Sequence, residues 1–152
     1  KFIEKSRPSV NHVWMKLAGQ QSYKIWSGFS FETICIKHVS QIKEGLKISG
    51  INSNSGSWVE KKSLNNAQID LLIDRDDNVI NLCEMKFYNS EFTIDKKYAF
   101  EIAKKVDAFV LSTKTRKSIF VTFLTTHGLK KNEYSKQIVQ NELIMNHLFV
   151  QL

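Results

Sequence analysis

Residues 67–88, AQIDLLIDRDDNVINLCEMKFY, decide the fold of this chain because they join two strand-like apolar runs through a turn. The turn is RDDN at residues 75–78, a composition that favours a tight reversal of the backbone. A hairpin centred on Asp77 pairs residues equidistant from it, which sets Asp70 opposite Glu84. Directly opposed Cβ atoms lie about 4.5–5.5 Å apart. The sequence therefore predicts a hairpin that brings two carboxylates together.

Side-chain alternation places these two acids on one strand face together with a lysine. Asp70 shares a face with Leu72, Leu71 points to the other face, and Glu84 shares a face with Lys86 in the second run. Two carboxylates this close repel each other unless a cation lies between them. We therefore expect a divalent metal at Asp70 and Glu84, with Lys86 neutralising charge beside it.

A purely structural role for these residues is the alternative. Asp70 would then be a polar residue at a strand end, and Glu84 and Lys86 would form an exposed ladder on a half-solvated sheet. The neighbours of Glu84 argue against this, because Cys83 and Met85 lie in a run typical of a strand buried on both faces. Burying an unpaired charge costs several kcal/mol or more, so a partner for Glu84 is expected.

The composition is typical of one globular domain with a polyanionic partner. The chain has 152 residues, is 42% hydrophobic and carries a formal net charge of +7. Positive charge favours nucleic acid through counterion release, although lysines also decorate solvated helix faces. No apolar run approaches the roughly 20 residues of a membrane span, so we expect a cytoplasmic protein with no membrane contact. Cys35 and Cys83 fit buried, reduced thiols of that compartment.

A helix is predicted at residues 28–45, where apolar residues recur at three- and four-residue steps. Ser30 is the expected N-cap, and Gly45 is the expected stop signal. Glu32 would then lie in the first turn, where an acid favours the helix dipole. This local role is an alternative to any chemical role for Glu32.

The remaining pattern predicts an α/β fold with a central mixed sheet flanked by helices. A hairpin followed by a helical crossover into a further strand produces this arrangement. Residues 1–25 are expected to form an N-terminal connector or tail before the domain at residues 26–152. The other elements are expected at residues 46–62 (a strand with a loop at 52–57), 95–111 (a helix capped by Asp95), 117–128 (a buried strand), 136–143 (an edge strand) and 144–149 (a short helix).

The order of these elements and motifs resembles the PD-(D/E)XK nuclease superfamily, which has the restriction-endonuclease-like fold. The segments SGFSFETICIKHV, AQIDLLIDRDDNVINLCEMKF and FTIDKKYA more closely resemble the C-terminal nuclease-like domain of a group of prokaryotic AAA+ family ATPases. The resemblance covers about residues 26–150. One departure is Ile69, which stands where the family's name has proline.

The resemblance implies a role for each residue of the motif. Asp70 and Glu84 would ligate Mg²⁺ or Mn²⁺, cations that favour carboxylate oxygen, and the backbone carbonyl of Met85 would join them. Lys86 would position or activate the attacking water and stabilise charge on the phosphate. Glu32 would complete the metal environment, directly or through water. These four side chains are then the expected catalytic set.

The resemblance also implies nucleic acid as the substrate, with DNA favoured, and an ATPase domain of the same longer chain as a partner. Lys97 or Tyr98 would contact a phosphate. One alternative is a nuclease-fold module that binds nucleic acid or protein for an attached ATPase without cutting. A third hypothesis is a structural domain, which would place Glu84 and Lys86 on a solvent-facing sheet edge. The sequence leaves the oligomeric state and the strandedness of the substrate open.

Overall fold

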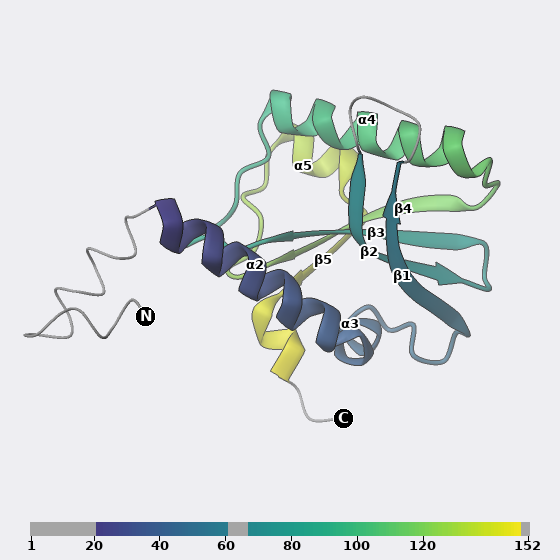
Figure 1. Ribbon diagram of the computed structural model, residues 1–152, viewed down its shortest axis with the longest axis horizontal. Coiled ribbons are helices and arrows are strands. Elements are labelled where there is room, and N and C mark those ends of the chain that lie inside the picture. The colour runs from purple at the N-terminus through teal and green to yellow at the C-terminus, as the bar shows by residue number, and fades with distance from the viewer. Residues whose placement is uncertain (1–20, 61–66, 150–152) are drawn as a thin grey trace, which may run out of the picture.

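The computed structural model describes residues 21–60 and 67–149 (Figure 1). The predicted connector therefore lies outside the described residues except for residues 21–25, which are helical. The elements along the chain are α2 (Gln21–Lys37), α3 (Val39–Gly45), β1 (Ser53–Val59), β2 (Gln68–Arg75), β3 (Val79–Lys86), α4 (Lys96–Thr113), β4 (Ser118–Thr125), α5 (Glu133–Ile138), β5 (Asn141–Ile144) and the 3₁₀ helix η1 (Met145–Phe149). None of the described helices is both long and apolar enough to cross a lipid bilayer.

The five strands form one mixed sheet in the order β1-β2-β3-β4-β5. The pairs β1–β2 and β2–β3 are antiparallel, whereas β3–β4 and β4–β5 are parallel. Helices α4 and α5 cover one face of the sheet, and α2, α3 and η1 lie on the other (Figure 1). The predicted α/β class, with a central mixed sheet flanked by helices, is confirmed.

The β2–β3 hairpin has the predicted register. Its pairs run from Leu71↔Cys83 to Asp74↔Ile80, all equidistant from Asp77. Asn78 adopts a left-handed conformation with φ of 65°, which asparagine tolerates better than most residues in a tight turn. The pair farthest from the turn is Leu71↔Cys83. Asp70 therefore lies just outside the paired part of the hairpin.

A β-bulge in β2 determines where the Asp70 side chain points. The pairs on either side of it are Gly56↔Leu72 and Trp58↔Ile69. Two residues of β2, Asp70 and Leu71, therefore lie opposite a single residue of β1. Such an extra residue breaks the alternation of side chains along the strand.

The apolar clusters on the two faces of the sheet show that the side chains of β2 change direction at the bulge. Ile69 belongs to the apolar cluster that includes Phe109 of α4. Leu71, two residues further on, belongs instead to the cluster that includes Phe31 of α2. The predicted strict alternation, which put both on one face, is therefore wrong at the bulge, and Asp70 and Leu71 both turn toward α2.

The first helix differs from its prediction in two ways. α2 begins at Gln21, so Ser30 lies within the helix and is not its N-cap. The helical path is also interrupted at His38, whose ring Nδ1 is 2.8 Å from the carbonyl oxygen of Ile34. Glu32 is consequently near the middle of α2, and its predicted role at the helix dipole is wrong. Gly45 does end the second segment, α3, as expected.

Residues 46–51, expected in a strand, form turns between α3 and β1, and two further segments were also mispredicted. Residues 53–57, expected in a loop, form most of β1, because pairing with β2 outweighs their low strand propensity. Residues 136–138, expected in a strand, end α5, which Asn132 caps through its side chain. The helix capped by Asp95 and the buried strand β4 are confirmed. Cys35 and Cys83 are buried and free, as predicted.

Candidate functional site

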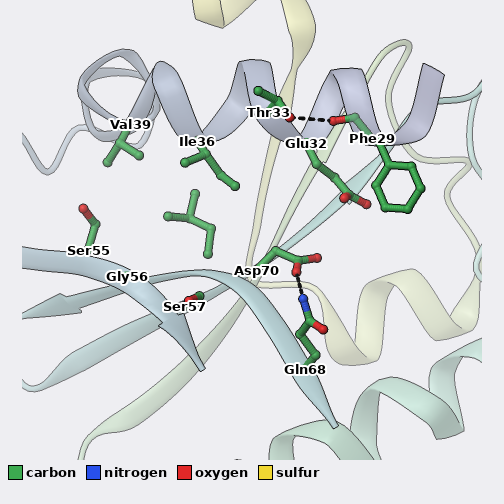
Figure 2. A pocket seen from close by; sticks show the side chains of 11 residues that line it. Phe29, Glu32, Thr33, Ile36, Val39, Ser55, Gly56, Ser57, Gln68 and Asp70 are labelled. Carbon is green, nitrogen blue, oxygen red and sulfur yellow. Dashed lines mark hydrogen bonds between the residues drawn. The ribbon is translucent and has the colours of Figure 1, made fainter. Parts of the chain in front are cut away.

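A groove of about 500 Å³ lies between α2 and the strands β1 and β2. Phe29, Ile36 and Val39 contribute its apolar wall on the helical side. Residues 55–57 and Leu71 form the floor on the sheet side. Two acids, Glu32 and Asp70, also line this groove, and Figure 2 shows their carboxylates pointing toward one another from the helix and the strand.

Asp70 is half-buried, and the bulge turns its side chain toward α2. Its Oδ1 accepts a hydrogen bond of 2.5 Å from the side-chain Nε2 of Gln68 (Figure 2). Gln68 is a residue that the sequence analysis did not single out. Its amide fixes one carboxylate oxygen of Asp70 and leaves the other directed into the groove.

The Glu32 carboxylate responds to the charges around it. Partial burial raises its pKa above the ordinary value of 4.5, and the negative charges of Asp70 and Glu84 raise it further. The positive charges of Lys86 and Lys105 act in the opposite direction. Asp70 and Glu84 are therefore near enough to Glu32 to influence its ionisation, and the net effect favours protonation of Glu32.

Glu84 is the most buried of the three acids, with 6% of its surface exposed. It lies on β3 and faces α4, where both of its carboxylate oxygens have partners. Tyr98 donates its hydroxyl proton to Oε2 at 3.1 Å, and the ammonium group of Lys105 forms an ion pair with Oε1. The predicted alternative of an exposed Glu84–Lys86 ladder is wrong, because Glu84 is not solvent-facing.

Tyr98 supports this arrangement as a hydrogen-bond donor. Burial and the neighbouring charge of Glu84 both raise the pKa of its hydroxyl group far above the ordinary value of 10.0. The phenol therefore stays protonated and continues to donate to Glu84. Its ring also lies beneath Lys86, whose Nζ is 5.2 Å from the ring centroid.

The remaining predicted site residues lie around this centre. Lys86 is on the same side of β3 as Glu84 but contacts the Tyr98 ring, and among the described residues it forms no ion pair. Met85 has a buried side chain and lies on β3 beyond its last pair with β2. Lys97 is exposed in the first turn of α4.

The prediction that Asp70 and Glu84 share one face of the sheet is wrong. The hairpin register agrees with the prediction, but the bulge directs Asp70 into the groove beside α2, while Glu84 faces Tyr98 and Lys105 on α4. Over residues 21–60 and 67–149, no three His, Cys, Asp or Glu side chains are arranged so that they could hold a metal ion.

Lys105, the ion-pair partner of Glu84, was not among the predicted site residues. It lies seven residues after Tyr98 on α4, a spacing that puts both on one helix face. That spacing, together with the expected burial of Glu84, could have indicated that Lys105 is a partner of Glu84. Helix α4 thus supplies two hydrogen-bonding groups to one buried carboxylate.

Comparisons with known proteins give a limited result. No family model matches the chain, and no curated protein matches it either. A solved structure described as a protein of unknown function, AF1548, is similar with a TM-score of 0.46 and 15% sequence identity. That similarity covers 72% of this chain and 56% of the AF1548 chain, so this protein spans little more than half of that chain's length.

Proposed function

We propose that this protein is a metal-dependent nuclease domain of the PD-(D/E)XK type, acting on nucleic acid, with DNA favoured. The observation that carries the proposal is the meeting of Glu32 and Asp70 in one groove, with Glu84 close enough to raise the pKa of Glu32. The order α2-α3-β1-β2-β3-α4-β4 also supports it, because Glu32 lies on the first described helix, Asp70 on β2 and Glu84 on β3.

The donor chemistry suits Mg²⁺ or Mn²⁺. Glu32, Asp70 and Glu84 offer hard carboxylate oxygens, and the main-chain carbonyl of Met85 would be a fourth donor. Mutual repulsion between Glu32 and Asp70 is the electrostatic condition that a cation relieves. Glu84 fits less directly, because Lys105 and Tyr98 hold its oxygens in the conformation described here.

The residues of the chain have separate tasks in this proposal. A bound divalent cation would supply Lewis acidity to the phosphate and lower the pKa of a bound water. Lys86, whose ammonium group is fixed over the Tyr98 ring, would stabilise negative charge that develops on the phosphate. Phe29 and Ile36, which flank Glu32 on α2, would form the apolar edge of the groove beside the acids. The net charge of +7 favours approach of a polyanion.

A non-cleaving module is the second candidate, and one observation favours it. Both oxygens of Glu84 are already satisfied by protein groups, and the described residues contain no assembled metal cluster. Such a module would bind nucleic acid or protein for an ATPase domain of the same longer chain. Its binding to DNA would weaken with salt and need no Mg²⁺.

Cleavage assays with matched variants distinguish these functions. The protein is incubated with plasmid and single-stranded DNA in Mg²⁺ or Mn²⁺, beside Asp70→Asn and Lys86→Ala. Asp74→Asn is the control, because Asp74 is an exposed acid of the same strand that pairs with Lys117. We expect both site variants to lose activity by roughly 100-fold or more and the control to retain it. Equal cleavage by all four proteins rejects the assignment, and salt-sensitive binding without cleavage supports the second candidate.

A further inference from the structure

The Glu84 carboxylate already has a positively charged partner, which is the side chain of Lys105. The Lys105 ammonium group pairs with Oε1, while the Tyr98 hydroxyl donates to Oε2 at 3.1 Å. The side chain of Glu84 is only 8% exposed, and that of Lys105 is 26% exposed. A carboxylate buried to this extent requires a positive partner, because desolvation otherwise favours its protonation.

The other lysine of the site does not perform this task. Lys86 comes two residues after Glu84 on β3, yet its Nζ lies over the Tyr98 ring at 5.2 Å from the centroid. Lys105 instead reaches Glu84 from α4, about two helical turns after Tyr98. The two ammonium groups are therefore distinct in position, and the one on Glu84 is not part of the recognised motif.

We propose that Lys105 is an internal counter-ion that competes with a divalent metal for Glu84, so that metal binding requires the ammonium group to leave the carboxylate. This inference rests on the proposed metal site and adds a residue that controls its occupancy. The ammonium group and a metal ion cannot occupy the same oxygen, and their positive charges also repel each other. The native ion pair thus lowers the metal affinity of the site and stabilises the metal-free fold.

The decisive comparison is between a variant that removes the positive charge at position 105 and a variant that keeps it. Lys105→Met keeps a long side chain without the charge, whereas Lys105→Arg keeps the charge. Lys104→Met is the matched control, because Lys104 is exposed on the same helix and lies over the ring of Phe100. Affinity for Mn²⁺ is measured by calorimetric titration of each protein.

We expect Lys105→Met to bind Mn²⁺ roughly tenfold more tightly than the natural protein, since one nearby charge shifts such an equilibrium by a unit of log K or more. Lys105→Arg and Lys104→Met should bind as the natural protein does. Unchanged or weaker binding by Lys105→Met, with clear binding by the natural protein, overturns the inference and leaves the metal site standing. Absence of binding by every variant overturns the metal site and the inference together.

Thermal unfolding without and with Mn²⁺ provides a second readout, in which the size of the metal-induced shift distinguishes competition from a merely structural role. Lys105→Met should melt at a lower temperature than the natural protein without metal, because Glu84 loses its partner. Addition of Mn²⁺ should then raise its melting temperature by more than it raises that of the natural protein. If Lys105→Met does not fold, Lys105→Gln replaces it, since the amide can still donate to Glu84. Equal metal-induced shifts in the variant and the natural protein contradict competition.

Discussion

At the scale of single residues, Glu32 experiences a repulsion with a measurable consequence. Its carboxylate faces that of Asp70, and burial together with this charge raises the pKa of Glu32 above 4.5. A raised acid pKa in the folded state means that stability is fully present below the unfolded value and is lost as pH rises through the folded value. Above the unfolded value of 4.5, the cost of ionising Glu32 in the folded state therefore destabilises the metal-free fold.

The first prediction removes that charge. Glu32→Gln should raise the melting temperature at pH 7 without metal, and the difference from the natural protein should disappear below pH 4, where Glu32 is protonated in both states. The same variant should bind Mn²⁺ more weakly. Glu91→Gln serves as the control, because Glu91 is an exposed acid before α4. A lower melting temperature for Glu32→Gln at pH 7 would contradict the repulsion.

The second prediction concerns the buried thiol of Cys35. Burial raises its pKa from 9.0 to about 12, so the unfolded chain ionises first as the solution becomes alkaline. The free energy of unfolding should therefore fall by about 1.4 kcal/mol per pH unit between the unfolded and folded pKa values. Urea titrations at pH 8 and pH 10 should show a smaller loss for Cys35→Ala than for the natural protein. Equal losses would show that Cys35 ionises as easily in the folded state.

At the scale of elements, α4 is the helix that carries the partners of Glu84, and its first turn is fixed by Asp95. The Asp95 Oδ1 accepts a hydrogen bond of 2.7 Å from the backbone amide of Tyr98. The third prediction is that Asp95→Ala lowers the free energy of unfolding by about 1 kcal/mol, the usual value of an N-cap. Asp107→Ala, an exposed position within the same helix, is the control and should change it little. Urea unfolding measures both.

The elements that could be predicted are those whose signals are local. The hairpin register followed from the turn at residues 75–78, and the start of α4 followed from its cap at Asp95. The bulge at Asp70 could not be foreseen, because it depends on how β1 pairs with β2, and β1 itself has a loop-like composition. For the same reason the opposite directions of the Asp70 and Glu84 side chains could not be predicted. The Lys105–Glu84 pair joins a helix to a strand 21 residues away in sequence.

At the scale of the whole molecule, polar side chains connect four of the five strands. Arg75 of β2 donates to the Oδ1 of Asn81 of β3 at 3.2 Å. Asn81 in turn donates to Thr122 of β4 at 2.9 Å and to Asn141 of β5 at 3.1 Å. Asn81 and Thr122 are completely buried. Such a network is stabilising only while each member keeps its partners.

The fourth prediction tests this network. Asn81→Leu removes one hydrogen-bond partner from each of three polar groups on other strands, two of them buried, so it should lower the free energy of unfolding by about 3 kcal/mol. Ser118→Ala, at the exposed start of β4, is the control and should have a small effect. Urea unfolding with the same probe compares the two. A small effect of Asn81→Leu would show that the network contributes little to stability.

The β-bulge has a final consequence for how the molecule behaves in concentrated solution. β1 is an outer strand, and an outer strand with a regular backbone is a template for pairing with other molecules. Here the bulge interrupts the pairing between β1 and β2. Residues 53–57 of β1 carry only small polar side chains or none. Along residues 53–57 an incoming strand would pair with a bent edge and find little apolar surface to cover. The same distortion that directs an acid into the groove therefore protects this margin of the protein against aggregation.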